Sequence, residues 1–278
     1  MNYRHGYHAG NFADLAKHAA LLAWLRMLRA EGAAVRVVDT HAGAGFYDLS
    51  NPDFARSKEA EAGIKYLLGK DVPDSLKPLA QYVRAKNQGA GFRDHVGVYP
   101  GSPVLALDHG TQEDAYIGCE LRSDDFMLLQ HRISPRGEAV QSDGYAKAVA
   151  LSADGDSRKQ LYLIDPPFEL PGDYAAIVTT LRDVLAAQPD AGALVWLPLK
   201  DLETFDGFLR HFERELPDGD VLVTELRLRS LWNPMKMNGC CLVAVNAPEG
   251  FEAVVTAIGR DVVAVFGEES GLARTWRL

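Results

Sequence analysis

Apolar segments of two kinds alternate along this chain. Residues 12–30 predict a helix, because apolar side chains such as Leu15 and Leu22 recur at helical spacing. Residues 35–39 form a short β-branched run that predicts a buried strand. From residue 114 onward we expect strands and helices in turn, over residues 114–121, 123–132, 138–142, 144–152, 161–165, 173–187, 192–198 and 201–216. This alternation predicts an α/β fold with a mostly parallel sheet and helices on both of its faces.

The last part of the pattern breaks this alternation. Residues 221–229 and 241–245 predict two strands with no room for a helix between them, and therefore an antiparallel pair at one edge of the sheet. The loop between them, residues 230–239, is long for a hairpin and contains Trp232 and Met235. An exposed loop could grip a flipped base or its backbone. A packed loop whose Trp and Met side chains fill the core is the interpretation we favour.

Residues 51–92 interrupt the pattern in another way. They contain two helical segments, 55–68 and 74–87, and no convincing strand. We expect this stretch to form a small helical subdomain, inserted into one main domain made of residues 1–50 and 93–278. The chain then returns to the main domain through Ser102 as a helix N-cap, with Pro103 at the first helical position.

Composition agrees with one large α/β domain and a small appendage. The chain has 278 residues, of which 47% are hydrophobic and 24% charged. No apolar run approaches the length of about 18 residues that a membrane span needs, so no membrane association is expected. The three cysteines, Cys119, Cys240 and Cys241, form no CxxC motif and predict a cytoplasmic protein without a disulfide frame.

Charge is unevenly distributed along the chain. Residues 1–100 contain 13 Lys and Arg against 10 Asp and Glu, a balance of +3, so the net charge of −9 leaves −12 for the remainder. A phosphate-binding surface needs only local positive charge. The candidate residues for such a surface are Arg4, His5, His8, Lys17, Lys58, Lys65, Lys70, Lys77, Arg84, Lys86 and Arg93. Acidic residues are interleaved with the later ones, so a solvated helix face is an equal alternative.

The tetrapeptide Asp165-Pro166-Pro167-Phe168 follows the predicted strand at 161–164. Two prolines end a strand, because proline has no N–H to donate, and they form a rigid turn at the edge where open α/β sheets bind ligands. The turn presents an acid, a carbonyl and an aromatic ring. Methylation of the exocyclic amine of adenine needs these groups, because acceptors localise the lone pair of the amine and a ring stacks on the base. An ordinary loop after a strand is the alternative.

A glycine-rich turn at residues 40–45 follows the strand at 35–39. Small residues here let the backbone approach a nucleotide-like ligand. The spacing differs from the GxGxxG of dinucleotide sites, and no GxxxxGK[ST] phosphate loop occurs. Glu120 follows a second predicted strand, and Asp143-Gly144 follows a third. This order of strands and acids fits a binding site for S-adenosylmethionine, in which Glu120 would accept hydrogen bonds from the ribose hydroxyls and Asp143 would lie near the adenine amino group. Taken alone, Glu120 could be a surface acid and Asp143-Gly144 an ordinary turn.

Motifs from the N-terminus to about residue 170 carry a family resemblance. They are Asn2-Tyr3-Arg4-His5, His8-Ala9-Gly10-Asn11, Ala13-Asp14, Lys17-His18, Asp39-Thr40-His41-Ala42-Gly43-Ala44-Gly45, Tyr99-Pro100-Gly101-Ser102-Pro103, Glu120-Leu121, Asp143-Gly144 and Leu163-Ile164-Asp165-Pro166-Pro167. Through them the chain resembles the RlmJ-type 23S ribosomal RNA adenine-N6 methyltransferases, once described as proteins for using external DNA. The resemblance implies a Rossmann-like, S-adenosylmethionine-dependent methyltransferase fold.

The resemblance also implies roles for individual residues. The cofactor-binding set is His18, His41, Gly43, Ser102, Glu120, Asp143, Gly144 and Asp165. By the same resemblance Asp165 is in addition the catalytic acid, and Tyr3 contacts RNA. We expect Arg4 and Lys17 to contact RNA as well, with anchoring of the first helix as an alternative for Lys17. The family's Asp-Pro-Pro-Tyr motif ends in Phe168 here, which loses a hydroxyl group and keeps the stacking face.

We therefore expect a methyltransferase of the 23S rRNA adenine(2030)-N6 type. In the hypothesised direct transfer, Asp165 and the carbonyl of Pro166 accept the hydrogen bonds of the amine, and Phe168 stacks on the base. Rival functions are a DNA adenine-N6 methyltransferase, a binding protein for external DNA without catalysis, and a small-molecule methyltransferase. The spacing of His5, His8, His18 and His41 matches no zinc signature, so no metal is expected. The protein is expected to be a monomer.

Overall fold

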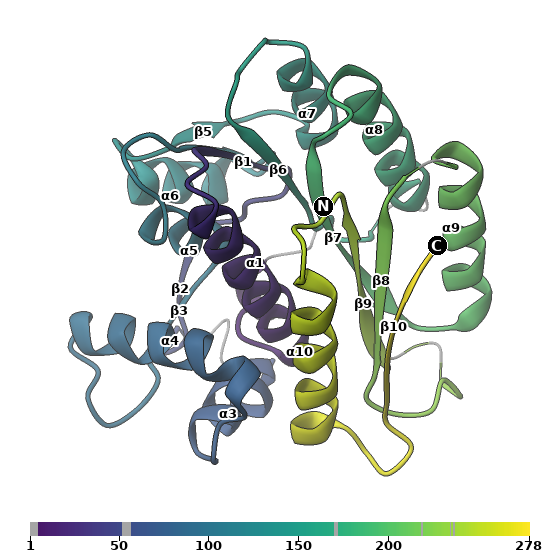
Figure 1. The fold of residues 1–278 in the computed structure, drawn as a ribbon. Helices are drawn as coiled ribbons and strands as arrows, with labels where there is room; N and C mark the ends of the chain where they lie inside the picture. Colours follow the sequence, from purple (N-terminus) through teal and green to yellow (C-terminus); the bar gives the residue numbers. More distant parts are fainter. Residues whose placement is uncertain (1–4, 52–56, 170–171, 218, 234, 236) are drawn as a thin grey trace.

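The computed structural model describes residues 5–51, 57–169, 172–217, 219–233, 235 and 237–278 (Figure 1). The strands are β1 (Val35–Asp39), β2 (Phe46–Asp48), β3 (Val98–Pro100), β4 (Ala115–Cys119), β5 (Glu138–Val140), β6 (Lys159–Ile164), β7 (Gly192–Leu199), β8 (Val221–Arg227), β9 (Gly239–Val245) and β10 (Leu272–Arg277). The α-helices are α1 (Phe12–Ala30), α3 (Tyr66–Leu68), α4 (Lys77–Gly89), α5 (Ser102–Asp108), α6 (Ser123–Ile133), α7 (Gly144–Ser152), α8 (Asp173–Ala187), α9 (Leu202–Glu215) and α10 (Phe251–Phe266). Shorter turns are η1 (His5–Tyr7), η2 (Glu61–Lys65, π-helical) and η3 (Asp74–Leu76).

Eight of the described strands form one sheet in the order β10-β8-β9-β7-β6-β1-β4-β5. The five strands from β7 to β5 are all parallel. The apolar pattern predicts each of these strands. The bounds of β1 agree, and those of the other four differ by a few residues, as strand ends commonly do. The predicted α/β fold with a mostly parallel sheet is confirmed.

Side chains of the central strands alternate between two apolar layers. On β6, Leu161 and Leu163 enter one layer, whereas Tyr162 and Ile164 enter the other. The first layer is covered by α1, α5, α6 and α10, and the second by α7, α8 and α9. Figure 1 shows α1 and α10 side by side on their face of the sheet. Helices on both faces are therefore confirmed.

The C-terminal part of the sheet is antiparallel. β9 runs antiparallel to both β7 and β8, which confirms the predicted antiparallel pair. Two further elements were not predicted. β10 adds another antiparallel strand beyond β8, and α10 packs against α1, where Phe251 lies 4.8 Å from Trp24 between ring centroids.

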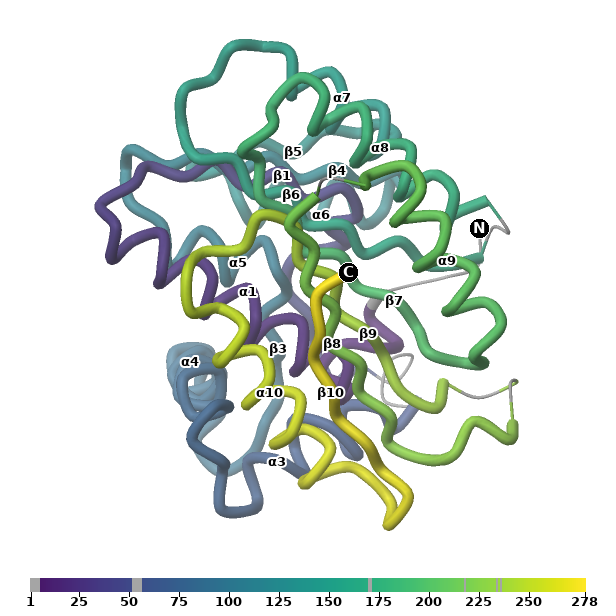
Figure 2. Tube along the Cα trace, turned by 45° about the vertical axis from the view of Figure 1, so that its right-hand side comes forward, coloured from purple at the N-terminus to yellow at the C-terminus, as the bar shows by residue number. Residues whose placement is uncertain are grey.

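The insertion lies between β2 and β3, which pair with each other as a separate two-stranded sheet. Its described residues form η2, α3, η3 and α4, which lie beside the α1 and α10 layer in both views (Figures 1 and 2). Apolar residues of the insertion, such as Ile64 and Leu79, belong to the same buried layer as α1. Its division from the main domain at residues 51 and 92 stays a prediction, and residues 52–56 lie outside the described residues.

The start of α5 differs from the prediction. α5 begins at Ser102, with Gly101 as its N-cap and Pro103 in its first turn. The prediction of Ser102 as N-cap is wrong by one residue, because the Ser102 hydroxyl donates a hydrogen bond to Asp39 Oδ2 at 2.6 Å and does not cap the helix.

Cys119, Cys240 and Cys241 are buried and free. Within the described ranges, no helix combines the length and the apolar character needed to cross a bilayer.

Candidate active site

Three acidic residues end neighbouring parallel strands at one edge of the sheet. Asp39 is the last residue of β1, Glu120 follows β4, and Asp165 follows β6. β1 lies between the other two strands, so the three carboxylates come to the same edge. The backbone N–H of Thr40 donates to β6 at 3.0 Å, and that of Ala42 donates to β4 at 2.9 Å. The glycine-rich turn and the proline turn therefore lie on the same side of the sheet, as the hypothesis requires.

Asp165 forms a buried ion-pair cluster with α1. The ammonium group of Lys17 pairs with Asp165 and also with Asp14, at 2.9 Å between Nζ and Oδ1. Burial raises the pKa of Asp165 above its ordinary value, and Lys17 opposes that rise. Burial also disfavours the charge on Lys17, but the two carboxylates outweigh it and hold the pKa of Lys17 well above its usual range. Burial alone would raise the pKa of Asp14, but Lys17 and His18 together lower it to about 2.

A cavity of about 250 Å³ opens beside Asp165. Pro166, Pro167, Phe168 and Trp196 form one wall, and the beginning of α1 forms another. The ring of Phe168 meets Trp196 edge to face at 5.8 Å between centroids. Its backbone has φ 51°, a left-handed conformation that is uncommon outside glycine and often found at functional sites. Aromatic walls with acceptors at one end suit a planar heterocycle.

A smaller cavity also borders Asp165. His18, His41 and Ser102 line it, so three of the predicted cofactor residues converge there. His8, Asp14, Lys17 and Asp165 line both cavities. Asp165 therefore stands at the junction between a base-sized cavity and the glycine-rich turn.

The hydroxyl of Tyr99 fixes the orientation of the His18 ring. Its Nδ1 lies 2.8 Å from the Tyr99 hydroxyl, and the two rings stack at 5.6 Å between centroids. His18 is only 2% exposed, and this burial lowers its pKa to about 3. The imidazole is therefore neutral at physiological pH, with one nitrogen as donor and the other as acceptor.

Asp39 holds two residues that line the smaller cavity, Ser102 and His41. It is fully buried and accepts hydrogen bonds from the Ser102 hydroxyl at 2.6 Å, the Tyr116 hydroxyl at 2.9 Å and the backbone N–H of His41 at 3.3 Å. Burial raises the pKa of Asp39, and these hydroxyl donors oppose the rise. Asp39 thus orients Ser102 and the turn that carries His41.

Glu120 is held against the glycine-rich turn. Its carboxylate accepts hydrogen bonds from the backbone N–H groups of Gly43 at 3.1 Å and Arg122 at 2.8 Å. Burial raises the pKa of Glu120, and the two backbone donors oppose this effect. Gly43 therefore fixes the direction of the Glu120 carboxylate through its N–H.

The segment after β5 completes this edge. Asp143 is the N-cap of α7 and accepts from the Ala146 N–H at 3.0 Å. A Cβ atom on Gly144 would lie 1.9 Å from the Thr40 carbonyl oxygen, so only glycine allows α7 to begin against the turn after β1. The hydroxyl of Tyr145 is buried without a hydrogen-bond partner among the described residues. An unsatisfied buried hydroxyl beside the turn fits a site that receives a polar ligand.

Three predicted RNA contacts have different outcomes. Tyr3 and Arg4 lie outside the described residues. The ammonium group of Lys17 is buried between two carboxylates, which agrees with its alternative role as an anchor. Contact between Lys17 and RNA stays a prediction.

Sequence reasoning missed two residues of the larger cavity. Glu59 accepts from the Asn11 amide at 2.8 Å and lies 2.8 Å from Nδ1 of His8, which joins the insertion to the N-terminal segment. Asn11 is also the N-cap of α1. The Asn11-x-x-Asp14 pattern before an apolar run is typical of a helix N-terminus and could have predicted this position. Trp196 lies inside an ordinary apolar strand, and no local pattern marks it as part of a cavity.

The loop between β8 and β9 corrects another expectation. Trp232 is 92% exposed and Met235 is 90% exposed, so the packed interpretation of this loop is wrong for both side chains. The buried amide of Asn238 holds the base of the loop by donating to the carbonyls of Lys200 at 3.0 Å and Asn233 at 2.9 Å. These hydrogen bonds hold Asn233 and Asn238 at the base of the loop, while the side chains of Trp232 and Met235 stay exposed.

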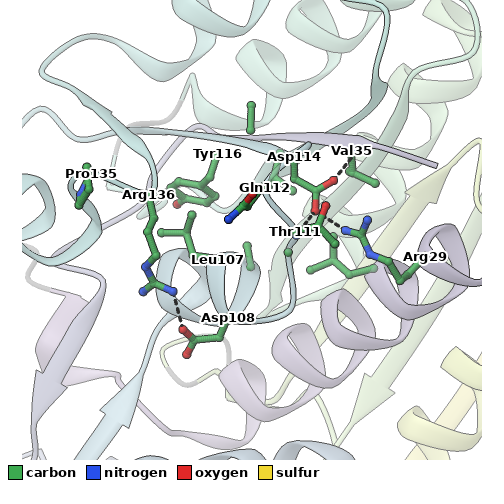
Figure 3. A pocket seen from close by; sticks show the side chains of 15 residues that line it. Arg29, Val35, Leu107, Asp108, Thr111, Gln112, Asp114, Tyr116, Pro135 and Arg136 are labelled. Carbon is green, nitrogen blue, oxygen red and sulfur yellow. Dashed lines mark hydrogen bonds and ion pairs between the residues drawn. The ribbon is translucent and has the colours of Figure 1, made fainter. Parts of the chain in front are cut away.

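A third cavity, of about 550 Å³, lies at the opposite ends of the parallel strands, near the first residues of β1 and β4 (Figure 3). Its charged side chains pair with one another, Arg29 with Asp114 and Arg136 with Asp108. Because these charges are already neutralised, size alone does not make this cavity the reactive site. Among the described residues, no group of three or more His, Cys, Asp or Glu side chains is placed to hold a metal ion.

Comparison with known proteins identifies the family. The family described as "Ribosomal RNA large subunit methyltransferase D, RlmJ" matches residues 32–278, so the chain belongs to the RlmJ family. The sheet order and this membership together confirm the predicted Rossmann-like methyltransferase fold.

Individual relatives agree with this assignment. A Haemophilus influenzae protein named Ribosomal RNA large subunit methyltransferase J is 26% identical over 264 residues, covering 93% of this chain and 91% of the relative. An Escherichia coli protein of the same name is 31% identical over 202 residues, covering 72% and 70%. A crystal structure of a Legionella pneumophila protein matches with a TM-score of 0.87 at 24% identity, covering 97% of this chain and 98% of the other, and therefore shares the fold.

Proposed function

We propose that this protein transfers a methyl group from S-adenosylmethionine to the N6 amine of an adenine in 23S ribosomal RNA. The position of Asp165 at the junction of two cavities is the observation that carries this proposal. Family membership and two relatives named as large-subunit rRNA methyltransferases support the substrate class.

The larger cavity is the proposed seat of the target base. Phe168 and Trp196 supply aromatic faces, and Asp165 and the Pro166 carbonyl supply acceptors at the reacting end. The two acceptors take the N–H bonds of the amine, which localises its lone pair toward the donor. A base must leave its helix to enter such a cavity, so an unpaired or flipped adenine is the expected substrate.

The smaller cavity and the edge around it are the proposed cofactor site. Glu120 would accept the ribose hydroxyls, Asp143 and Gly144 would lie at the cofactor's adenine, and His18, His41 and Ser102 would hold its methionine part. When bound, S-adenosylmethionine supplies an activated methyl group. Neutral His18 and the buried Tyr145 hydroxyl are polar groups that fit such a ligand.

Asp165 acts mainly through its charge in this proposal. The amine becomes positively charged only as the new bond forms, so a carboxylate fixed beside it stabilises that charge. Lys17 orients the carboxylate and opposes its protonation in the buried site. Asp165 therefore needs no unusual basicity before the reaction, and afterwards its oxygen can accept the proton that the amine loses.

The test is methyl transfer to 23S rRNA isolated from cells that lack this protein, followed by nucleoside analysis for N6-methyladenosine. We expect Asp165→Ala and the isosteric Asp165→Asn to lower the rate at least 100-fold, with S-adenosylmethionine binding retained in calorimetry. Glu120→Ala should instead weaken that binding about tenfold or more, because it removes the proposed ribose acceptor. Asp206→Ala, on the exposed face of α9, is the matched control.

Turnover of both Asp165 variants near the wild-type rate would refute the mechanism. Equal methylation of RNA and of DNA with the same sequence would favour a DNA methyltransferase, because the 2′-hydroxyl would then have no role. Absence of any cofactor binding by the wild type would favour a binding protein for external DNA. Methylation of free adenosine as fast as RNA would favour a small-molecule enzyme.

A further inference from the structure

A basic cavity lies in the insertion, away from the reacting groups. It has a volume of about 410 Å³ and is bounded by α3, α4 and the loop that follows α4. Lys65, Arg84, Arg93 and His95 line it, and Asp94 is the one acidic residue in its lining. A net negative protein thus has a local concentration of positive charge, which favours an anionic partner.

The two arginines of this cavity are not neutralised within the described ranges. Neither Arg84 nor Arg93 forms an ion pair with a described carboxylate, and the guanidinium of Arg84 donates only to the Leu68 carbonyl, at 3.1 Å. Lys65 pairs with Glu61 one helical turn away, a partly exposed contact of little strength. Other basic residues of the expected RNA surface, Lys77 and Lys86, pair with carboxylates. Within the lining of this cavity, the charge available to a partner therefore lies mainly on Arg84 and Arg93.

An aromatic pair lies in the same cavity. Phe92 and His95 meet edge to face at 5.1 Å between ring centroids, and Phe92 is half-buried. Cationic side chains beside aromatic rings are the combination with which proteins bind single-stranded nucleic acid.

One helical segment links this cavity to the candidate active site. Glu59, at its beginning, lines the larger active-site cavity, and Leu68, at its end, lines the basic cavity. Nine residues at the rise of an α-helix set an upper limit of about 13 Å on this separation, because η2 is π-helical and bends at Gly63. This is the length of a few nucleotides. The segment is fixed in place, because the Ile64 N–H donates to the Gly10 carbonyl at 2.8 Å.

We propose that this basic cavity binds the phosphate backbone of the RNA strand a few nucleotides from the target adenine. The proposal rests on the proposed function, since it assigns the partner of the same site. Arg84 and Arg93 contact phosphates, and Phe92 packs against a sugar or base. These contacts hold the strand in register while the adenine occupies the larger cavity.

The experiment compares two double variants of the full-length protein. R84Q/R93Q removes two charges from the cavity, and R26Q/R210Q removes two exposed arginines that have no carboxylate partner among the described residues, on α1 and α9. Affinity for unmethylated 23S rRNA made by transcription is measured from 50 to 200 mM salt. S-adenosylmethionine binding is measured by calorimetry as a check on folding.

For R84Q/R93Q we expect about tenfold weaker RNA binding and a salt slope smaller by about 1.4, which is two phosphates at about 0.7 each. Its KM for RNA should rise, while kcat at saturating RNA and cofactor affinity stay unchanged. R26Q/R210Q should change the RNA affinity less than twofold.

Equal weakening by both double variants would overturn the proposal, because only overall charge would then matter. Unchanged RNA binding together with lost binding of polyglutamate would also overturn it, in favour of an acidic protein partner. A selective effect of R84Q/R93Q on RNA binding supports the cavity even if no methyl transfer occurs, in which case the proposed function fails separately.

Discussion

His18 illustrates how burial alone sets the protonation state of a single residue. The ring is 2% exposed, and its nearest hydrogen-bonding partner is the neutral hydroxyl of Tyr99. No stabilising charge compensates fully for the loss of water, so the pKa falls from 6.5 to about 3. A neutral imidazole can donate and accept at once, which suits a group expected to hold the amino-acid part of a cofactor.

This shift predicts an acid-sensitive contribution to stability. Between pH 6.5 and about 3 the unfolded chain binds a proton at His18 that the folded chain does not, so lowering the pH favours unfolding. We expect a loss of about 1.4 kcal/mol per pH unit in this window. In His18→Gln this contribution disappears, so urea unfolding at pH 7, 6, 5 and 4.5 should show a flatter dependence than in the wild type.

The control is His131→Gln, the same substitution at an exposed position of α6, which should leave the pH dependence unchanged. Asp14, whose pKa is lowered to about 2, loses its contribution only as the pH falls below about 3.8, which is below the pH range of these measurements. If the free energy of unfolding depends on pH in the same way for the wild type and His18→Gln, this account is wrong.

The contact between η2 and the N-terminal turn decides how the insertion is attached. A Cβ atom on Gly63 would lie 2.0 Å from the Gly10 carbonyl oxygen and 2.8 Å from the Asn11 Cα. Gly63 also has non-helical angles, φ −103° and ψ −106°, where η2 bends over that turn. A side chain here would separate the insertion from the wall of the larger cavity.

Gly63→Ala should therefore destabilise the protein by about 1–3 kcal/mol, because the added methyl group overpacks a backbone contact. Gly89→Ala, at the end of α4, is the matched control, since nothing lies within 4 Å of its added Cβ, and it should be neutral or stabilising by up to about 1 kcal/mol. Chemical denaturation of both variants measures the difference. Equal stabilities would contradict the assigned role of this contact.

At the scale of the whole molecule, the last strand closes one edge of the sheet. β10 pairs with β8 along its length. Glu225 on β8 is fully buried and pairs with Arg227 and with Arg274 of β10. The C-terminal residues therefore cover an edge strand and help neutralise a buried charge, two tasks that adjacent strands often share.

Deletion of residues 272–278 should lower stability by about 3–5 kcal/mol, because it weakens the pairing of a buried carboxylate. It should also promote self-association, since the edge of β8 becomes free to pair with another chain. Thermal unfolding and size-exclusion chromatography measure the two effects. Arg274→Gln keeps the strand and should lose less stability without self-association, and an associating Arg274→Gln would contradict this division of roles.

Expectations that rest on local spacing were the accurate ones. The helix predicted at 12–30 and the strand predicted at 35–39 are α1 and β1, and both have the predicted bounds. The apolar pattern did not predict α10 and β10. It also failed at Trp232, because an aromatic side chain in a loop carries no local sign of whether it is covered.

The sequence by itself determined most of the strands and helices before residue 250, because hydrophobic period is a property of neighbouring residues. It also indicated that Glu120, Asp143 and Asp165 follow strands at one edge, because parallel strands all end on the same side of their sheet. Only the tertiary structure decided that Lys17 is buried against Asp165, 148 residues away, and that Glu59 and Trp196 line the same cavity. Ion pairs and cavity walls depend on how separate elements pack, and no local pattern encodes that packing.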